Sequence, residues 1–241
     1  MFALHRFSLV SALGLTALAL SHPAAAQTPA ITLSPGGLGA ESNAASVGVS
    51  SYSLGFEFTA NSPVFVTSLG YFYDPLFNPN SSTLTEAHQV GLYQVTPGVS
   101  GAPESDMLIA SASVTSAGTS NGNFLYTSIT PTALVTGGDY VLVGVTGATD
   151  PYLYAYNDSN GNSAIAVDPA ITYVQDRYVV SDTLAYAGST DPGSEPGFFG
   201  PNMQTSPVPE ASTTVSLGIL LVLGMAGLVL TARRRAAALA D

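Results

Sequence analysis

The sequence predicts an all-β fold, an antiparallel β-sandwich of the jelly-roll type with about eight strands. Two observations predict it. Short runs between residues 54 and 187 alternate apolar and polar side chains, with the period of a half-buried strand. Turn-forming residues separate these runs, and no helical apolar stripe continues there for three turns. We therefore expect one β-sandwich domain over 54–187.

The expected strands follow one another along this domain. Phe56 and Phe58 flank Glu57, and Val64 to Tyr73 is rich in β-branched and aromatic residues, which favour strands. Turn signals such as Gly137-Gly138 lie between the runs, because glycine accepts backbone angles that other residues avoid. The remaining strand candidates are 89–95, 108–114, 124–129, 141–145, 152–156, 171–174 and 178–186.

Two stretches of small and polar residues flank the domain. Residues 27–53 are rich in Ser, Gly, Ala and Pro and bury little, so we interpret them as a loose N-terminal arm with one short strand at most. Residues 188–207 are rich in Gly, Pro, Ser and Asp, a composition typical of flexible linkers. We interpret this second stretch as a stalk that holds the domain away from the segment that follows it.

Residues 1–26 have the layout of a secretory signal peptide, which we expect to be helical. A basic start at Arg6 precedes an apolar segment over 7–20, and the small residues Ala24 and Ala26 stand where a signal peptidase cuts. We expect export by the Sec machinery and cleavage after Ala26. The alternative is a retained membrane anchor, for which the apolar segment is short.

The C-terminal stretch 208–241 predicts a transmembrane helix over 215–232. That run carries no ionisable group and, at about 1.5 Å per residue, spans about 27 Å, close to the thickness of a bilayer's hydrocarbon core. Arg233, Arg234 and Arg235 follow it directly, and arginine accumulates on the cytoplasmic side of a membrane. We expect a cytoplasmic C-terminus with the domain outside. The alternative, a buried helix of a soluble domain, would show a polar face.

The tail also carries a family resemblance. Val208-Pro209-Glu210, the apolar run and the arginine cluster occur in the order of the PEP-CTERM sorting signal of Gram-negative bacteria, which this tail resembles. The usual pattern reads Pro-Glu-Pro, whereas Ala211 stands third here. The resemblance implies processing by an exosortase, a protease-transpeptidase-like membrane enzyme. It further implies a tethered protein that moves to the cell surface or into a biofilm's exopolysaccharide.

A second resemblance concerns the domain. Gly55-Phe56-Glu57-Phe58, the run from Val64 to Tyr73, Val90-Gly91-Leu92-Tyr93 and the run from Gly138 to Leu142 are together similar to an uncharacterised β-sandwich domain of bacterial extracellular proteins. This resemblance consists of strand and turn patterning. It implies the fold and an extracellular location, and it implies no known activity.

The region between residues 27 and 207 is strongly acidic. It contains all of the chain's 16 Asp and Glu residues except Glu210 and Asp241, and Arg177 is its only lysine or arginine. Such a surface repels phosphate backbones, which argues against a nucleic-acid partner. The chain has no cysteine, so neither disulfides nor thiolate metal sites are available. We expect Arg177 to pair with a nearby carboxylate, or else to orient an acidic ligand.

Enzymatic chemistry has little support. His88 is the only histidine between residues 27 and 207, so neither a Ser-His-Asp arrangement nor a zinc site with three or four nitrogen or sulfur ligands is indicated. We interpret His88, which follows Glu86 in a turn, as a solvated loop residue. Carboxylates for glycoside hydrolysis are numerous and scattered, so no pair stands out. We expect no catalytic residue, and a glycan-active hydrolase is the least favoured alternative.

A carbohydrate-binding site is a stronger alternative. Tyr152, Tyr154 and Tyr156 alternate, so on a strand their rings project from one face, and Asn157 and Asp158 follow at its end. Aromatic faces beside amide and carboxylate groups grip sugars, which would suit an exopolysaccharide-binding module. The competing interpretation is that the tyrosines pack as ordinary strand residues.

Calcium is the one cofactor that the sequence leaves open. Residues 157–162 place acidic and amide side chains around Gly161, as part of a calcium loop does. They lack the alternating Asp and Asn ligands and the distal Glu of an EF-hand. An Asx turn is the simpler interpretation, and we therefore expect no bound metal.

Overall fold

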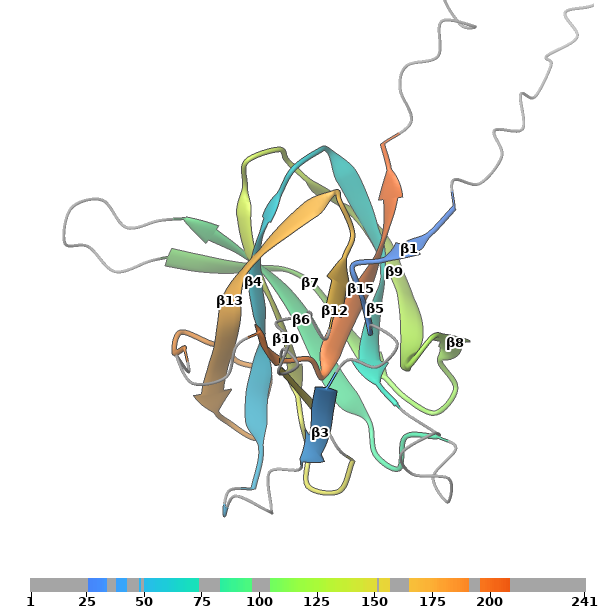
Figure 1. Cartoon of the computed structure of the whole chain (residues 1–241), viewed down its shortest axis with the longest axis vertical. Helices are drawn as coiled ribbons and strands as arrows, with labels where there is room; N and C mark the ends of the chain where they lie inside the picture. The colour runs from blue at the N-terminus through green and yellow to red at the C-terminus, as the bar shows by residue number, and fades with distance from the viewer. Residues whose placement is uncertain are drawn as a thin grey trace, which may run out of the picture.

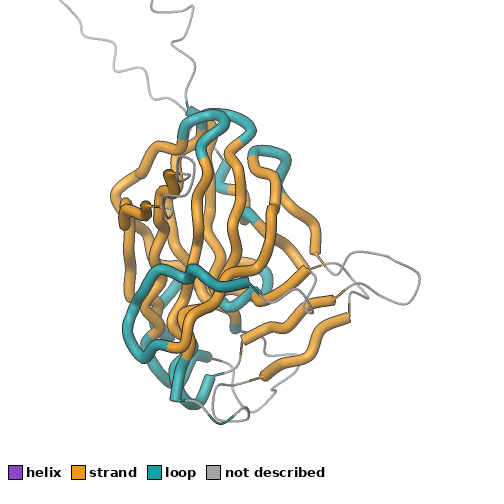
Figure 2. Tube along the Cα trace, turned by 90° about the vertical axis from the view of Figure 1, so that its left-hand side faces the viewer, coloured by secondary structure: helices purple, strands orange, loops and turns teal. Residues whose placement is uncertain are grey.

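The computed structural model describes residues 26–33, 38–42, 48, 50–73, 83–96, 105–150, 152–156, 165–190 and 196–208. Every regular element in these ranges is a β-strand, as Figure 2 shows. Within them no helix has the length and apolar character needed to cross a membrane. The signal peptide up to residue 25 and the transmembrane helix expected over 215–232 lie outside the described residues.

One sheet is built around β5 (Val64–Phe72) and is called the β5 sheet below. Its strand order is β1-β15-β5-β9-β8, and all of its pairings are antiparallel. The last strand along the chain therefore lies between the first strand and β5 (Figure 1). The other four strands are β1 (Thr28–Pro29), β8 (Thr119–Asn121), β9 (Phe124–Leu134) and β15 (Pro201–Pro207).

The second sheet, called the β10 sheet, is centred on β10 (Asp139–Val145). Its order is β13-β4-β10-β6-β7, again with antiparallel pairings only. The other four strands are β4 (Tyr52–Ala60), β6 (His88–Thr96), β7 (Ser105–Val114) and β13 (Ile171–Val180). Strand β7 also contacts β9, so the two large sheets approach each other along one side.

Two small sheets complete the described part of the chain. In the first, β11 (Tyr152–Tyr156) lies between β14 (Pro196–Phe198) and β3 (Leu38–Ser42). In the second, β2 (Ile31–Leu33) pairs with β12 (Ile165–Val167). Both join segments that are far apart in the sequence.

The two large sheets share one hydrophobic core. Phe56 and Phe58 of the β10 sheet and Val66 and Tyr71 of the β5 sheet are all 0% exposed and belong to the same buried cluster. Because side chains alternate along a strand, Glu57 lies on the opposite face of β4 from the two phenylalanines. The predicted all-β fold with antiparallel strands is thus confirmed for the described residues.

The interpretation of residues 27–53 as a loose arm is wrong at its N-terminal part. Ala30 is 0% exposed and Ile31 is 1% exposed, and both belong to the main core. The side chain of Asn202 in β15 accepts a hydrogen bond from the Ile31 N–H (3.2 Å) and donates one to the Ile31 carbonyl (2.7 Å). An amide side chain thereby pairs with Ile31 as a neighbouring strand would.

The interpretation of residues 188–207 as a flexible stalk is also wrong at its C-terminal part, residues 196–207. Residues 201–205 of β15 are buried, and Met203 belongs to the main core. Two of the prolines that suggested a linker, Pro201 and Pro207, stand at the two ends of β15, where a strand tolerates a residue without an N–H. The folded unit therefore extends from residue 28 to residue 207, beyond the expected boundaries of 54 and 187.

Two strand boundaries also differ from expectation. Strand β9 continues from Phe124 to Leu134 rather than ending at Ile129. The runs expected at 171–174 and 178–186 form one strand, β13, which ends at Val180. A register shift between Tyr173 and Gln175 in its pairing with β4 marks an irregularity, and this broke the alternation on which the prediction relied.

The strand register defines two ends of the molecule. At one end Pro207 pairs with Val64, and nearby Thr28 pairs with Thr205, so the chain enters β1 and leaves β15 side by side (Figure 1). We call this the terminal end. At the opposite, far end Pro201 pairs with Tyr71.

Candidate functional site

Three ionisable side chains converge at the far end. Glu86 precedes β6, His88 is the first residue of β6, and Asp150 follows the loop after β10. Ligand atoms of the three lie within 4.8 Å of one another. His88 is 0% exposed, Asp150 is 3% exposed and Glu86 is half-buried. We call these three residues the far-end cluster.

His88 is held by both of its ring nitrogens. Nδ1 lies 2.9 Å from the carbonyl oxygen of Val145, and Nε2 lies 3.0 Å from Oδ2 of Asp150. Both partners accept hydrogen bonds, so both bonds form together only when both nitrogens carry a proton. The ring also stacks on Tyr71, with centroids 3.7 Å apart and an angle of 4° between the planes. His88 thereby joins the two large sheets.

The two carboxylates of the cluster accept hydrogen bonds from each other's loops. Asp150 accepts from the backbone N–H groups of Thr85 (2.8 Å) and Glu86 (3.0 Å). Glu86 accepts from the backbone N–H groups of Thr149 (2.8 Å) and Asp150 (3.1 Å). The hydroxyls of Thr85 and Thr149 each donate to one of these carboxylates as well. The arrangement locks the loop before β6 to the loop after β10.

These bonds also set the acidity of the carboxylates. Burial raises the pKa of Asp150, but the hydrogen bonds from His88, from Thr85 and from the backbone of Glu86 outweigh it and lower the pKa to about 2. Burial likewise raises the pKa of Glu86, and the hydrogen bonds from Thr149 and Asp150 lower it below its usual value. Both carboxylates are therefore ionised at neutral pH.

One imidazole and two carboxylates are a conceivable donor set for a divalent metal ion. Here, however, both oxygens of Asp150 and Oε1 of Glu86 already accept hydrogen bonds from protein N–H or O–H groups. Both nitrogens of His88 are engaged too. A metal ion would have to displace several of these bonds, so the geometry fits a structural lock better than a metal site.

The interpretation of His88 as a solvated loop residue is wrong. His88 shares its strand parity with Val90 and Leu92, which are both 0% exposed and belong to the main core. Extending the alternation of β6 by one step toward the N-terminus would have placed His88 inside. Its partner Asp150 is distant in the sequence, and no local sequence pattern predicts the contact between the two residues.

Arg177 pairs with a carboxylate, as expected from the sequence. Its Nε lies 2.9 Å from Oε2 of Glu57, and the same oxygen accepts a hydrogen bond from the side chain of Gln175 at 2.7 Å. Glu57 is 8% exposed and Arg177 is 6% exposed. The Arg177 guanidinium also donates to the carbonyl of Gly188, which fixes the segment after β13 over the outer face of the β10 sheet.

The expected tyrosine row is only partly described. Tyr152, Tyr154 and Tyr156 do form strand β11. Tyr152 is 5% exposed and packs with Leu54, so this ring is not available to stack on a sugar. The side chains of Tyr154 and Tyr156, together with Asn157, Asp158 and the rest of the calcium hypothesis at 157–162, lie outside the described residues.

The predicted processing sites lie at the opposite end from the far-end cluster. Ala26 is exposed two residues before β1, and Val208 follows β15 directly and is half-buried. The remaining residues of these predictions lie outside the described residues: Ala24, Pro209, Glu210, Arg233, Arg234 and Arg235. The structure therefore describes one residue of each predicted signal, Ala26 and Val208.

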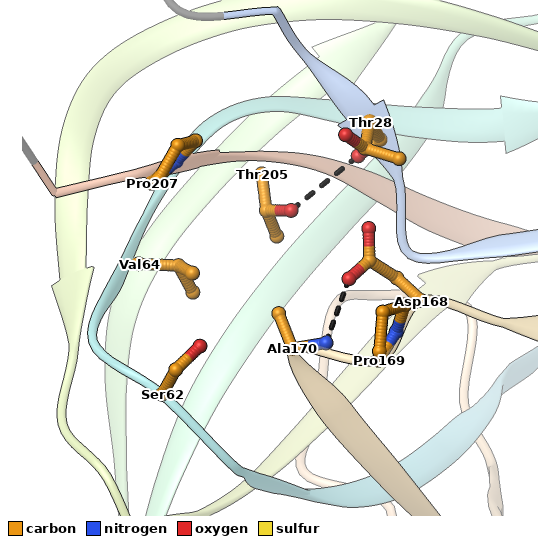
Figure 3. A pocket seen from close by; sticks show the side chains of 8 residues that line it. All are labelled: Thr28, Ser62, Val64, Asp168, Pro169, Ala170, Thr205 and Pro207. Atoms are coloured by element: carbon orange, nitrogen blue, oxygen red, sulfur yellow. Dashed lines mark hydrogen bonds between the residues drawn. The ribbon is translucent and has the colours of Figure 1, made fainter.

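A hollow of about 330 Å³ lies at this terminal end, as Figure 3 shows. Its walls come from Thr28 of β1, Val64 of β5, Thr205 of β15 and the turn 168–170 between β12 and β13. Asp168 supplies the only charged side chain among the described residues that line it. The hollow thus combines a carboxylate with hydroxyl and apolar groups.

The chain was compared with family models, with curated proteins and with solved structures, and it matches none of them.

Proposed function

We propose that this chain is an exported surface protein without enzymatic activity, made by a Gram-negative bacterium. Residues 1–26 direct its export, and residues 208–241 tether it to the inner membrane until an exosortase-type enzyme processes the tail. The domain it displays is a jelly-roll-like β-sandwich. After processing, the domain belongs to the cell surface or to the exopolysaccharide matrix.

The observation that carries this proposal is the pairing of the first and last strands. Thr28 of β1 lies opposite Thr205 of β15, so the export signal and the sorting signal join the domain at the same end. A domain attached in this way presents its opposite end to the surroundings. That far end contains the cluster of Glu86, His88 and Asp150.

The position of β15 also sets how far the domain stands from the membrane. The strand ends at Pro207, and only residues 208–214 separate it from the apolar run that begins at Val215. Fully extended, these residues reach about 24 Å. The tethered domain is therefore held at the membrane surface, with its terminal end toward the bilayer.

The buried ionisable groups named above are engaged with other protein groups, which supports a role as a surface protein rather than as an enzyme. Glu57 and Arg177 satisfy each other, and the far-end cluster is closed by protein hydrogen bonds. No other lysine or arginine lies between residues 27 and 207. Anionic polymers are repelled by such a surface, so the matrix polymers compatible with it are neutral or carry amines.

The location of the domain tests this proposal. Wild-type protein and a Glu210→Ala variant are produced in the native host, and the domain is quantified in the cytoplasmic, inner-membrane and extracellular fractions. Glu195→Ala, the same change upstream of the motif, is the control. We expect the wild type and the control outside the membrane and Glu210→Ala retained in it. Equal release of all three would refute tail processing at this motif, and a cytoplasmic domain would refute export.

A further inference from the structure

The hollow at the terminal end adjoins the site where the export signal is expected to be cut. Thr28 forms part of its wall, and Gln27, the first residue after the expected cut, is exposed directly before it. Cleavage after Ala26 converts the Gln27 amide nitrogen into a free α-ammonium group. A positive charge is thereby created one residue away from the hollow.

The carboxylate of Asp168 is placed to receive that charge. One of its oxygens accepts a hydrogen bond from the Ala170 N–H at 2.7 Å, while Figure 3 shows the other oxygen directed toward Thr28. The backbone N–H of Asp168 donates to the carbonyl of Ala30 at 2.9 Å. The turn that carries Asp168 is therefore fixed against the N-terminal strand by the main chain.

Competing cations are scarce around this carboxylate. Arg177, the only lysine or arginine between residues 27 and 207, is 6% exposed and occupied by Glu57. The α-ammonium of a chain that begins at Gln27 is thus the domain's own accessible positive charge. Charge complementarity favours the hollow as its binding place.

We propose that, once the chain has been cut after Ala26, the α-ammonium of Gln27 turns into the hollow and pairs with Asp168. This rests on the export proposed above. A single residue spans about 3.3–3.6 Å, so the new terminus is within reach of the wall that Thr28 forms. The uncut chain has a neutral amide at this position and cannot form the pair. Cleavage therefore adds an ion pair that holds β1 to the turn before β13.

The pair protects Gln27 from a reaction of its own side chain. An N-terminal glutamine cyclises when its neutral α-amine attacks the side-chain amide carbon. A carbon–nitrogen bond forms to the α-nitrogen, the bond to the amide nitrogen breaks, and the α-nitrogen's proton leaves with it as ammonia. An α-ammonium held by a carboxylate keeps its proton. An opposite charge at close range shifts a pKa by at least about one unit, which lowers the neutral fraction about tenfold.

The test follows loss of ammonia at Gln27 by intact mass, in protein recovered from its host and incubated at a pH of about 6.5, which is below the usual pKa of an α-amine. Asp168→Asn removes the charge but keeps an oxygen that accepts the Ala170 N–H. Asp182→Asn makes the same change at an exposed site after β13. We expect cyclisation about tenfold faster in Asp168→Asn than in the wild type, and an unchanged rate in Asp182→Asn.

A second measurement varies the salt concentration. Because salt screens an exposed ion pair, about 1 M salt should accelerate cyclisation in the wild type and leave Asp168→Asn unchanged. Equal rates in the wild type and Asp168→Asn overturn the pairing alone. So does a wild-type protein that is already fully cyclised when isolated. A recovered mass that still contains residues 1–26 overturns the export proposal, and the pairing with it.

Discussion

Glu86 and Asp150 each accept a hydrogen bond from the other's backbone N–H group. The Glu86 N–H donates to Asp150 Oδ2 at 3.0 Å, and the Asp150 N–H donates to Glu86 Oε1 at 3.1 Å. This reciprocal pairing joins two loops that are far apart in the sequence, and His88 extends it to the β5 sheet through Tyr71. The stability of the far end therefore depends on a few buried polar groups.

Replacement of His88 by alanine should destabilise the domain by about 3–5 kcal/mol, because it leaves the Asp150 charge buried without its partner. The measurement is the free energy of unfolding from urea titrations. Gln89→Ala, on the exposed face of the same strand, is the control and should change stability by about 0.5 kcal/mol or less. Equal, small effects of both variants would show that the His88 bonds contribute nothing.

Acid should weaken the domain through Asp150. Its pKa is lowered from 3.8 to about 2 in the folded state, so its contribution is fully present above about pH 4 and is lost as the pH falls through about 2. The contribution amounts to about 2 kcal/mol. Unfolding free energies at a series of pH values should fall less steeply for Asp150→Asn than for the wild type. Parallel curves would contradict this role.

The Glu57 and Arg177 pair should behave as a coupled unit. Arg177→Met leaves the Glu57 carboxylate buried and unpaired, which should cost about 3–5 kcal/mol. Adding Glu57→Leu to this variant should recover much of the loss, because no buried charge then remains. A double-mutant cycle of unfolding free energies measures the coupling. Strictly additive effects would mean that the two side chains do not depend on each other.

Asn202 should be essential for attaching the N-terminal strand segment to β15. It is 0% exposed and bonds to both the N–H and the carbonyl of Ile31. Asn202→Ala leaves these groups buried without partners and should cost at least about 2 kcal/mol. Asn121→Ala, at an exposed position in the edge strand β8 of the same sheet, is the control. A thermal melt of Asn202→Ala that matches the control would contradict the attachment.

Tyr71 offers a change in the opposite direction. Its hydroxyl is buried and has no hydrogen-bond partner among the described residues, while its ring stacks on His88. Tyr71→Phe keeps the ring and removes the unsatisfied hydroxyl, so stability should stay equal or rise by about 1 kcal/mol. Thermal unfolding measures this, and a marked loss of stability would reveal a partner for the hydroxyl.

The sequence predicted those features that depend on neighbouring residues. Alternation identified β4, because Phe56 and Phe58 face the core while Glu57 does not. It also left Arg177 as a lone cation that needed a carboxylate. It could not show that β15 is a buried strand, because the pairing of Thr205 with Thr28 joins opposite ends of the domain.

The far-end cluster and the hollow could not be predicted from the sequence for the same reason. Extending the side-chain alternation of β6 to His88 would have predicted its burial. Its contact with Asp150, however, depends on how the loop after β10 returns to the start of β6. The hollow beside Asp168 likewise forms only where β1, β5 and β15 lie next to one another. Local composition does not predict contacts between segments that are distant in the sequence, so only the folded structure reveals them.

Export and tail processing are tested together by the intact mass of the protein recovered from its native host. We expect a chain that begins at Gln27 and ends between Pro207 and Val215, because cleavage further upstream would remove β15 from the β5 sheet. A mass that retains both residues 1–26 and Arg233-Arg234-Arg235 would contradict it, and so would a folded product that ends before β15.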